Sequence, residues 1–218
     1  MNYEPFIDKL MQHYTGSRYL SEVASAKEEF FDRAGTFDEA SLDFELKMAQ
    51  FTDWYLFVRK LRDANKAPVE MALEDSDFKA FESDKNAFLN LRNSRRSLFE
   101  FQKVKKEDVY IRDLFTNFKY VIRSSRVNQG FNPDELFEAR LIPYDGGFVF
   151  SNSFCFHPNS VSKYILKEVK RVSKLPDEEQ ATAREDLMSR LFRMKYRHEQ
   201  YRHLDINEIY SNESRVRI

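Results

Sequence analysis

The hydrophobic period of the chain changes twice along its length. Up to about residue 94, apolar side chains recur every three or four positions, which is the spacing of one helix face. From Ser97 to His157 they tend to alternate with polar ones, as on a half-buried strand, and after Pro158 the helical spacing returns. These periods predict an α+β fold with three segments packed as one compact unit: a helical region over 1–94, an antiparallel strand module over 95–157 and C-terminal helices over 158–210.

The N-terminal segment contains start and stop signals for several helices. Ser17 and Asp38 are residue types whose side chains accept the first free backbone N–H groups of a helix, and Ala34-Gly35 is a typical helix end. We expect helices over 3–14, 17–33 and 38–61, a short helical turn from Pro68 and another helix from Asp77.

The middle segment is rich in β-branched and aromatic residues, which favour strands, and Asp145-Gly146-Gly147 within it is a hairpin signal. Short antiparallel strands in succession leave two sheet edges that must be protected. We therefore expect the sheet to close into a small barrel or to bend over the helices. Six strands are predicted: Ser97–Val104, Val109–Leu114, Phe118–Ser124, Glu135–Ile142, Phe148–Ser151 and Phe154–His157.

Two helices are predicted after Pro158, the second being long, charged and running from Asp177 past Tyr201. This second helix has an apolar stripe on one side, formed by Leu187, Leu191, Met194 and Tyr201. A one-sided stripe on a charged helix suits packing on another surface. We expect this helix to form a protruding arm that packs on a partner or on a second copy of the chain.

Composition excludes several classes of protein. The chain has 35 Lys and Arg against 36 Asp and Glu, so bulk attraction to nucleic acid or to an anionic membrane is not expected, although local basic patches can still occur. Its one cysteine, Cys155, cannot form an internal disulfide or a paired-cysteine zinc site. No segment approaches the roughly 20 apolar residues that span a bilayer, and the N-terminus lacks the features of a signal peptide. We expect a cytoplasmic protein with no membrane partner, no cofactor and no metal.

Signatures of known catalytic sites are absent from the sequence, which has no Gly-rich phosphate loop, no G-x-S-x-G elbow and no HExxH motif. Cys155 and His157 stand two residues apart and could act as nucleophile and base. The alternative is a small buried residue on an aromatic strand, because free cysteine is among the most buried residue types. No catalytic residue is predicted.

Four charged residues inside the strand segment are candidates for a polar binding patch: Arg112, Asp113, Glu138 and Arg140. A buried charge is destabilising unless it is paired, so these residues need partners. The alternative is a structural ion pair, or the solvent face of an alternating strand. In the turn after the second predicted strand, Asp113 or Thr116 can accept backbone N–H groups and Asn117 tolerates a left-handed backbone.

Two stretches of the C-terminal helices carry a local excess of positive charge. Five basic residues between Pro158 and Lys174 accompany one acidic residue, and the same holds between Met188 and His203. Such residues could contact phosphates while the interleaved aromatic rings stack on bases; a solvated or intramolecularly neutralised surface is the alternative. The first stretch contains Lys163, Lys167, Lys170, Arg171 and Lys174; the binding residues predicted in the second are Arg190, Arg193, Lys195 and Arg197, and the rings are Phe192, Tyr196 and Tyr201.

Four segments together resemble a group of uncharacterised bacterial proteins: FTDWYLFV at 51–58, SLFEF at 97–101, VYIRDLFT at 109–116 and LFEARL at 136–141. In that group, a helical half with an aromatic D-W-x-x-F helix precedes a strand module with an R-D-L-x-T turn and an A-R-L strand. Some members carry an added SEC-C zinc motif, which a chain with one cysteine cannot have. The resemblance covers about residues 44–171 and implies a shared fold without implying an activity.

Two functions are therefore predicted. The leading one is a non-enzymatic interaction or regulatory protein that binds a protein partner or a second copy of itself. The alternative is a nucleic-acid-binding protein that uses the barrel face and the basic C-terminal helices, by analogy with other small barrels. An enzyme ranks third, and the observation that would favour it is a pocket gathering Glu138, Arg140, Cys155 and His157.

Overall fold

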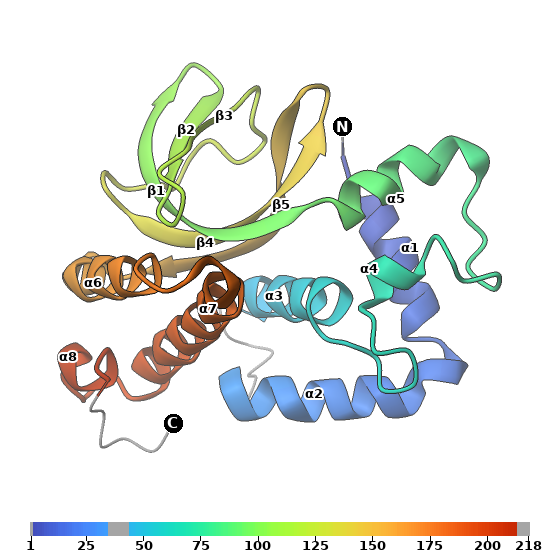
Figure 1. The fold of residues 1–218 in the computed structure, drawn as a ribbon, viewed down its shortest axis with the longest axis horizontal. Coiled ribbons are helices and arrows are strands. Elements are labelled where there is room, and N and C mark those ends of the chain that lie inside the picture. The colour runs from blue at the N-terminus through green and yellow to red at the C-terminus, as the bar shows by residue number, and fades with distance from the viewer. Residues whose placement is uncertain (1, 35–43, 213–218) are drawn as a thin grey trace. The chain divides into compact units, whose positions relative to one another are not determined.

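A computed structural model describes residues 2–34 and 44–212 of the chain. It confirms the predicted α+β class: these residues contain eight α-helices, and their five strands form one antiparallel sheet (Figure 1). The N-cap predicted at Asp38 lies outside the described residues. No helix within the two described ranges combines the length and the apolar composition needed to cross a membrane.

Among the N-terminal helices whose predicted starts are described, all but one begin close to the predicted position. The helix predicted near residue 17 starts with a 3-10 turn over Ser17–Tyr19, and the helix predicted from Asp77 begins several residues later. The elements are α1 (Glu4–Tyr14), α2 (Leu20–Ala34), α3 (Phe44–Phe57), α4 (Pro68–Met71), the 3-10 helix η2 (Glu82–Asp84) and α5 (Lys85–Arg92).

Hydrogen bonds to Asp75 explain why no helix begins at Asp77. One carboxylate oxygen of Asp75 accepts the backbone N–H of Asp77 at 2.9 Å, and the other lies 3.1 Å from Nε2 of His13, far away in the sequence. These contacts hold the segment 75–81 in turns and bends. Phe81, which a helix from Asp77 would include, is 72% exposed. The prediction is therefore wrong because a tertiary contact overrides the local pattern.

The five strands are hydrogen-bonded in the order β3-β2-β1-β4-β5. Phe99 of β1 lies opposite Asp113 of β2, and the register shifts between Phe101 and Lys103. Such a bulge strengthens the local twist of the strand. The bounds are β1 (Arg95–Lys105), β2 (Asp108–Asp113), β3 (Lys119–Ile122), β4 (Leu136–Tyr144) and β5 (Gly147–His157).

The prediction of a six-stranded barrel is wrong in two respects. The segments predicted as the last two strands are one continuous strand, β5, because Asn152 and Ser153 keep the extended backbone. The sheet also stays open, with β3 and β5 at its two ends. β3 has only four residues and exposes Lys119. A short edge strand with a charged side chain is protected from pairing with other chains, so the β3 edge needs no closure.

The hairpin between β4 and β5 confirms the turn signal in the sequence. Asp145 and Gly146 have φ angles of 46° and 69°, the left-handed values that a two-residue type I′ turn requires at both positions. The turn returns β5 directly beside β4. As a result, the strand that carries Glu138 and the strand that carries Cys155 and His157 are neighbours.

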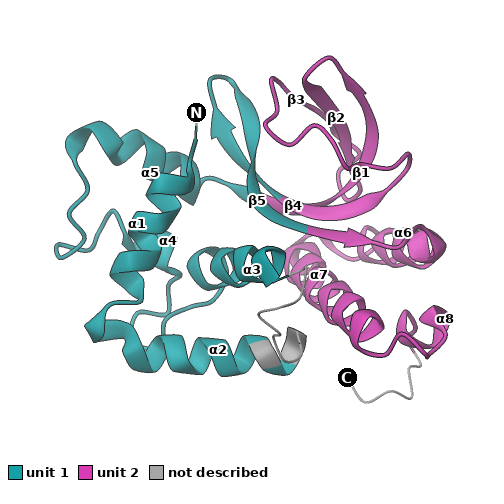
Figure 2. Ribbon diagram, turned by 180° about the vertical axis from the view of Figure 1, so that it is seen from behind, with its two compact units in different colours: residues 1–32, 36–95, 140–154 teal, residues 33–35, 96–139, 155–218 magenta. Residues whose placement is uncertain are grey.

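The described residues form two compact units, which Figure 2 colours separately. Unit 1 covers residues 2–32, 44–95 and 140–154. Its core is largely aromatic: Phe51 stacks on Tyr55, and the Tyr55 hydroxyl donates to the backbone oxygen of Tyr14 at 2.6 Å. This bond satisfies the hydroxyl, so a fully buried tyrosine is tolerated there.

Unit 2 consists mainly of residues 96–139 and 155–212. Its helical part holds the 3-10 helix η3 (Asn159–Val161), α6 (Ser162–Val172), α7 (Asp177–Gln200) and α8 (Ile206–Ile209). Apolar side chains from the strands and from all of these helices form one core, which includes Leu98, Leu114, Leu136, Val161, Ile165, Val169, Leu187, Leu191, Met194 and Ile209.

The apolar stripe of α7 lies inside this core. Leu187, Leu191 and Met194 are at most 1% exposed, and of the four stripe residues only Tyr201 reaches solvent substantially, at 37%. The interpretation of α7 as an arm with a free apolar face is therefore wrong, because unit 2 itself covers the stripe.

Leu191→Ala should lower the free energy of unfolding by about 2–5 kcal/mol, the range for truncating a fully buried leucine. Leu166→Ala is the matched control, since Leu166 lies in the same unit on α6 but is 40% exposed, and it should change the free energy by no more than about 0.5 kcal/mol. Urea denaturation of both variants measures the difference. Equal effects would contradict the burial of the α7 stripe.

Candidate functional site

The side chains of Glu138, Cys155 and His157 meet inside unit 2. Glu138 of β4 and Cys155 and His157 of β5 are 2%, 4% and 2% exposed. One potential ligand atom from each residue lies within 4.8 Å of the other two. Buried polar groups normally find hydrogen-bond partners, so such a cluster calls for an account of where each polar atom is satisfied.

Glu138 and His157 each have one side-chain polar atom with a hydrogen-bond partner and one without, among the described residues. Arg96 of β1 donates to Oε2 of Glu138, and Nδ1 of His157 is 3.2 Å from the Tyr210 hydroxyl. The remaining atoms, Oε1 of Glu138 and Nε2 of His157, are buried without a hydrogen-bond partner among the described residues. These two atoms lie 3.6 Å from each other.

The electrostatics keep the cysteine protonated. Burial raises the pKa of the Cys155 thiol well above its usual range, and the charge of Glu138 raises it further, against the opposing charge of Lys195. Burial also raises the pKa of the Tyr210 hydroxyl. A nucleophilic cysteine must be a thiolate, so this environment does not favour the interpretation of Cys155 and His157 as nucleophile and base.

Arg140 does not join Glu138, Cys155 and His157, the residues that it would have to meet in a pocket indicating an enzyme. It binds Asp53 in unit 1 instead. Its Nε and one terminal nitrogen donate to the two carboxylate oxygens of Asp53 at 2.7 and 2.9 Å, and its guanidinium lies over the ring of Phe57. Arg140 and Asp53 are 5% and 6% exposed. Arg140 is therefore half of a buried structural ion pair in unit 1.

Arg112 and Asp113 have structural partners as well. Arg112 donates two hydrogen bonds of 3.0 Å to Glu100 on the neighbouring strand. Asp113 accepts the backbone N–H groups of Phe115 and Thr116 at 2.8 and 2.9 Å. Asn117 has a φ of 58°. The interpretation of this segment as a strand end with a capped turn is confirmed.

The basic residues predicted on α7 are half-buried. Lys195 pairs with Glu199 at 2.8 Å, and Arg190 donates to Glu168 at 2.8 Å. The basic residues of the preceding stretch are exposed instead. These exposed residues are Lys163, Lys167, Lys170, Arg171 and Lys174.

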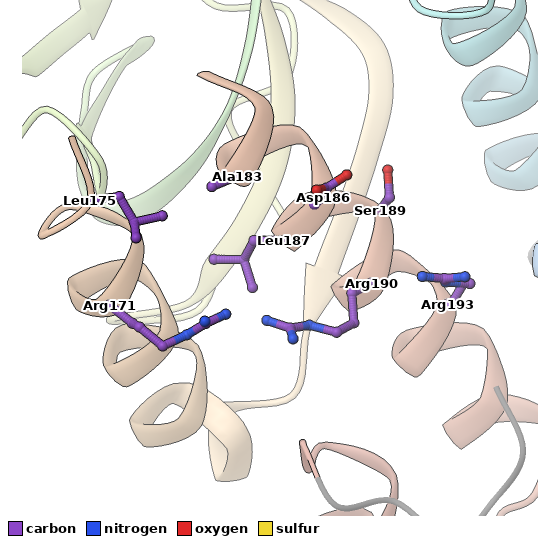
Figure 3. A pocket seen from close by; sticks show the side chains of 8 residues that line it. All are labelled: Arg171, Leu175, Ala183, Asp186, Leu187, Ser189, Arg190 and Arg193. Atoms are coloured by element: carbon purple, nitrogen blue, oxygen red, sulfur yellow. The ribbon is translucent and has the colours of Figure 1, made fainter. Parts of the chain in front are cut away.

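The two basic stretches meet at a cavity of about 400 Å³ in unit 2. Figure 3 shows the guanidinium groups of Arg171 from α6 and Arg190 from α7 extending toward each other across it, with Leu187 on its wall. Arg193 also lines the cavity, and Asp186 is its acidic lining residue. The lining is thus mostly cationic and apolar, a composition that suits a small anion or one group of a larger anion.

Glu168 holds the two arginines at this cavity. Its Oε2 accepts from Arg171 at 3.1 Å and from Arg190 at 2.8 Å, while Oε1 accepts from Asn212 at 2.9 Å. Burial opposes the charged form, but the hydrogen bond from Asn212 and the charges of both arginines outweigh it and lower the pKa of Glu168. Glu168 is therefore a charged, fully bonded residue although it is only 1% exposed.

Sequence reasoning missed three residues of these sites. Arg96 and Tyr210 are 42 and 53 positions away from their partners in the chain, and no local pattern connects them. Glu168 had a signal, since it is the one acidic residue in a run of five cations. An isolated acid among bases often marks the residue that neutralises them.

The sequence model of the family DUF7986, which is described as a family of unknown function, matches residues 2–202 of the chain. The chain belongs to this family. The DUF7986 match spans α1 to α7 and the whole sheet, so it includes Glu138, Cys155, His157 and Glu168. Nothing in it links the chain to proteins with the SEC-C motif. Searches of curated proteins and of solved structures gave no significant match.

In this DUF7986 protein, the Arg140–Asp53 and Arg112–Glu100 pairs, both bidentate, should differ sharply in their contribution to stability. Arg140→Ala leaves the carboxylate of Asp53 buried and unpaired and should lower the free energy of unfolding by about 3–5 kcal/mol. Arg112→Ala is the control, because that pair is partly solvated, with the Arg112 side chain 32% exposed, and its loss should be about 1 kcal/mol or less. Chemical denaturation compares them, and a larger loss for Arg112→Ala would contradict the assignment.

Glu168→Gln should destabilise the protein in a pH-dependent way. The folded-state pKa of Glu168 lies below its usual value of 4.5, so its stabilisation is complete above pH 4.5 and is lost as the pH falls through the folded pKa. At pH 7 the variant should lose about 2 kcal/mol, as expected for hydrogen bonds to a charged group. The difference from wild type should shrink in acid, whereas Glu178→Gln, at an exposed position of α7, should show no such trend.

Proposed function

We propose that the protein is a non-enzymatic binding protein and that the exposed face of α6 in unit 2 contacts a nucleic-acid backbone. The proposal combines the interaction role with the nucleic-acid alternative, because the charge distribution favours an anionic partner. The observation that carries it is the row of exposed lysines along α6 that ends at the cationic cavity.

The spacing of the lysines supports a backbone contact. Lys163, Lys167 and Lys170 follow one another at intervals of four and three residues, so they lie on one face of α6, and Lys174 follows just past the last residue of the helix, Val172. At 1.5 Å per residue, the three lysines on the helix span about 10 Å, which covers a few successive phosphates. The buried face of α6, with Ile165, points into the unit 2 core.

The cavity supports an additional anchoring point beside the row. Arg171 stands between Lys170 and Lys174 in the sequence and reaches the cavity that Arg190 lines from α7. The Nε atom of Arg190 is buried and has no hydrogen-bond partner among the described residues. A phosphate oxygen would satisfy this donor and match the planar geometry of both guanidinium groups.

The aromatic rings of α7 limit what such a surface could recognise. Phe192 and Tyr196 are 8% and 5% exposed, so of the three rings that the sequence suggested only Tyr201, at 37%, is available to stack on a base. Contacts would then be made mainly to phosphates, which position a protein without reading the sequence. We therefore propose binding with little sequence preference.

The cellular setting also remains part of the proposal. A reducing, cytoplasmic environment is consistent with the single buried cysteine, and nucleic acid is available there. Kinship with bacterial proteins that carry the SEC-C motif rests on the four matching segments described above. Neither statement is needed for the binding test.

Fluorescence anisotropy with a labelled duplex DNA and a labelled single-stranded RNA tests the proposal. The logarithm of the wild-type binding constant should fall linearly with the logarithm of the salt concentration. Replacing three lysines of the row, Lys163, Lys167 and Lys170, by Gln should weaken binding to both probes and reduce the magnitude of the salt slope by about 2–3.

The matched control replaces three exposed lysines of other elements, Lys60, Lys79 and Lys105, by Gln, which changes the net charge equally. This control should leave affinity and slope nearly unchanged. Absence of binding at low salt, or an equal loss in the control, would contradict the proposal.

A further inference from the structure

We propose that Glu138, Cys155 and His157 form a binding site for a divalent transition-metal ion, best matched by zinc. The ligand atoms would be Oε1 of Glu138, Sγ of Cys155 and Nε2 of His157, which lie within 4.8 Å of one another. The site is in the interior of unit 2 and does not depend on the proposed contact with nucleic acid.

The donor set selects the class of metal. A thiolate and an imidazole are ligands for zinc and related transition metals, whereas calcium and magnesium prefer sites made only of oxygen atoms. Zinc sites with three protein ligands and a fourth position for water or another small ligand are common. Binding the ion would release the proton of the Cys155 thiol, and the thiolate and the carboxylate together would then carry two negative charges, which balance those of a divalent ion.

The distances fit tetrahedral coordination after a small contraction. Oε1 of Glu138 and Nε2 of His157 are 3.6 Å apart. That is close to the edge of about 3.3 Å between two ligand atoms that each lie about 2.0–2.1 Å from a tetrahedral zinc ion. Sγ of Cys155, within 4.8 Å of both, would need to approach by about 1 Å to reach its own edge of about 3.6 Å.

The unpartnered atoms point to a missing ligand. Nε2 of His157 and Oε1 of Glu138 belong to side chains that are 2% exposed, and among the described residues neither atom has a hydrogen-bond partner. A separation of 3.6 Å is too long for a hydrogen bond between them. Two buried polar atoms that face each other at this distance are satisfied together by one cation between them.

The outer contacts are those expected around a metal site. A metal-ligating histidine usually donates its other ring N–H to a partner, and ligating carboxylates are themselves hydrogen-bonded. When Nδ1 of His157 carries the proton, it donates to the Tyr210 oxygen and leaves the lone pair of Nε2 free. Arg96 binds the second oxygen of Glu138, which aims Oε1 at the cluster.

The alternative is a metal-free ion pair between Glu138 and protonated His157. It uses two of the three residues and gives no role to the proximity of Cys155. It also predicts that added zinc neither binds at this site nor stabilises the folded chain.

Cobalt and zinc titrations of the full chain, first stripped with a chelator, separate these arrangements. We expect one cobalt ion per chain, with a thiolate-to-cobalt charge-transfer band in the near ultraviolet and the intense visible bands of tetrahedral cobalt. Zinc should displace the cobalt and raise the Tm, whereas magnesium should do neither. Since Cys155 is the one cysteine of the chain, a charge-transfer band reports on this site alone.

Variants test the individual ligands. Cys155→Ser should abolish the charge-transfer band, and His157→Gln should weaken zinc binding at least tenfold, whereas His203→Gln, at an exposed histidine, should not. Tyr210→Phe, which keeps the ring and removes only the partner of Nδ1, should weaken zinc binding about 10–100-fold because outer contacts orient the ligand. Circular dichroism checks that each variant is folded.

Several outcomes would overturn the proposal. Wild-type protein that shows no charge-transfer band and no rise in Tm with zinc would establish the metal-free ion pair. A cobalt spectrum that persists in folded Cys155→Ser, or equal losses in His157→Gln and His203→Gln, would mean that the ion binds elsewhere. The wild-type measurements decide the question even if a variant fails to fold.

Discussion

The burial of β4 is the constraint on which much of the structure depends. Every residue over 136–142 is buried, and two of them, Glu138 and Arg140, are charged. A charge inside a protein is strongly destabilising without a partner, so each needs one. Arg140 binds Asp53 within unit 1, and Glu138 binds Arg96 within unit 2. The strand therefore contributes one buried ion pair to each unit, and the segments that supply the partners must pack against it.

The two buried glutamates that the structure describes in unit 2 differ in how completely they are bonded. Glu168 accepts hydrogen bonds at both carboxylate oxygens, so its role as the centre of a structural network needs no ligand. Glu138 is bonded at one oxygen only, and its other oxygen faces an equally unsatisfied nitrogen of His157. Because unsatisfied buried groups are rare in folded proteins, this contrast distinguishes a structural carboxylate from a candidate ligand.

Of the eight residues that the sequence singled out, most have roles explained by neighbouring contacts. Asp113 caps a turn, Arg112 pairs across two strands, and Arg190 is held by Glu168. These roles were partly visible in the sequence, since a charged residue on a strand of Phe and Leu must have a partner. The identity of the partner was not visible, because a residue such as Asp53 is 87 positions away from Arg140.

The sequence by itself determined the α+β class, the helical periods of both ends and the β4–β5 turn, because these follow from local spacing and from backbone preferences of single residues. It also determined that only one thiol exists. The tertiary structure decided that the sheet has five strands and stays open, and that the stripe of α7 is covered. It also decided that Glu138, Cys155 and His157 meet. Those outcomes depend on which distant side chains fill the space beside a strand, and no local pattern encodes that packing.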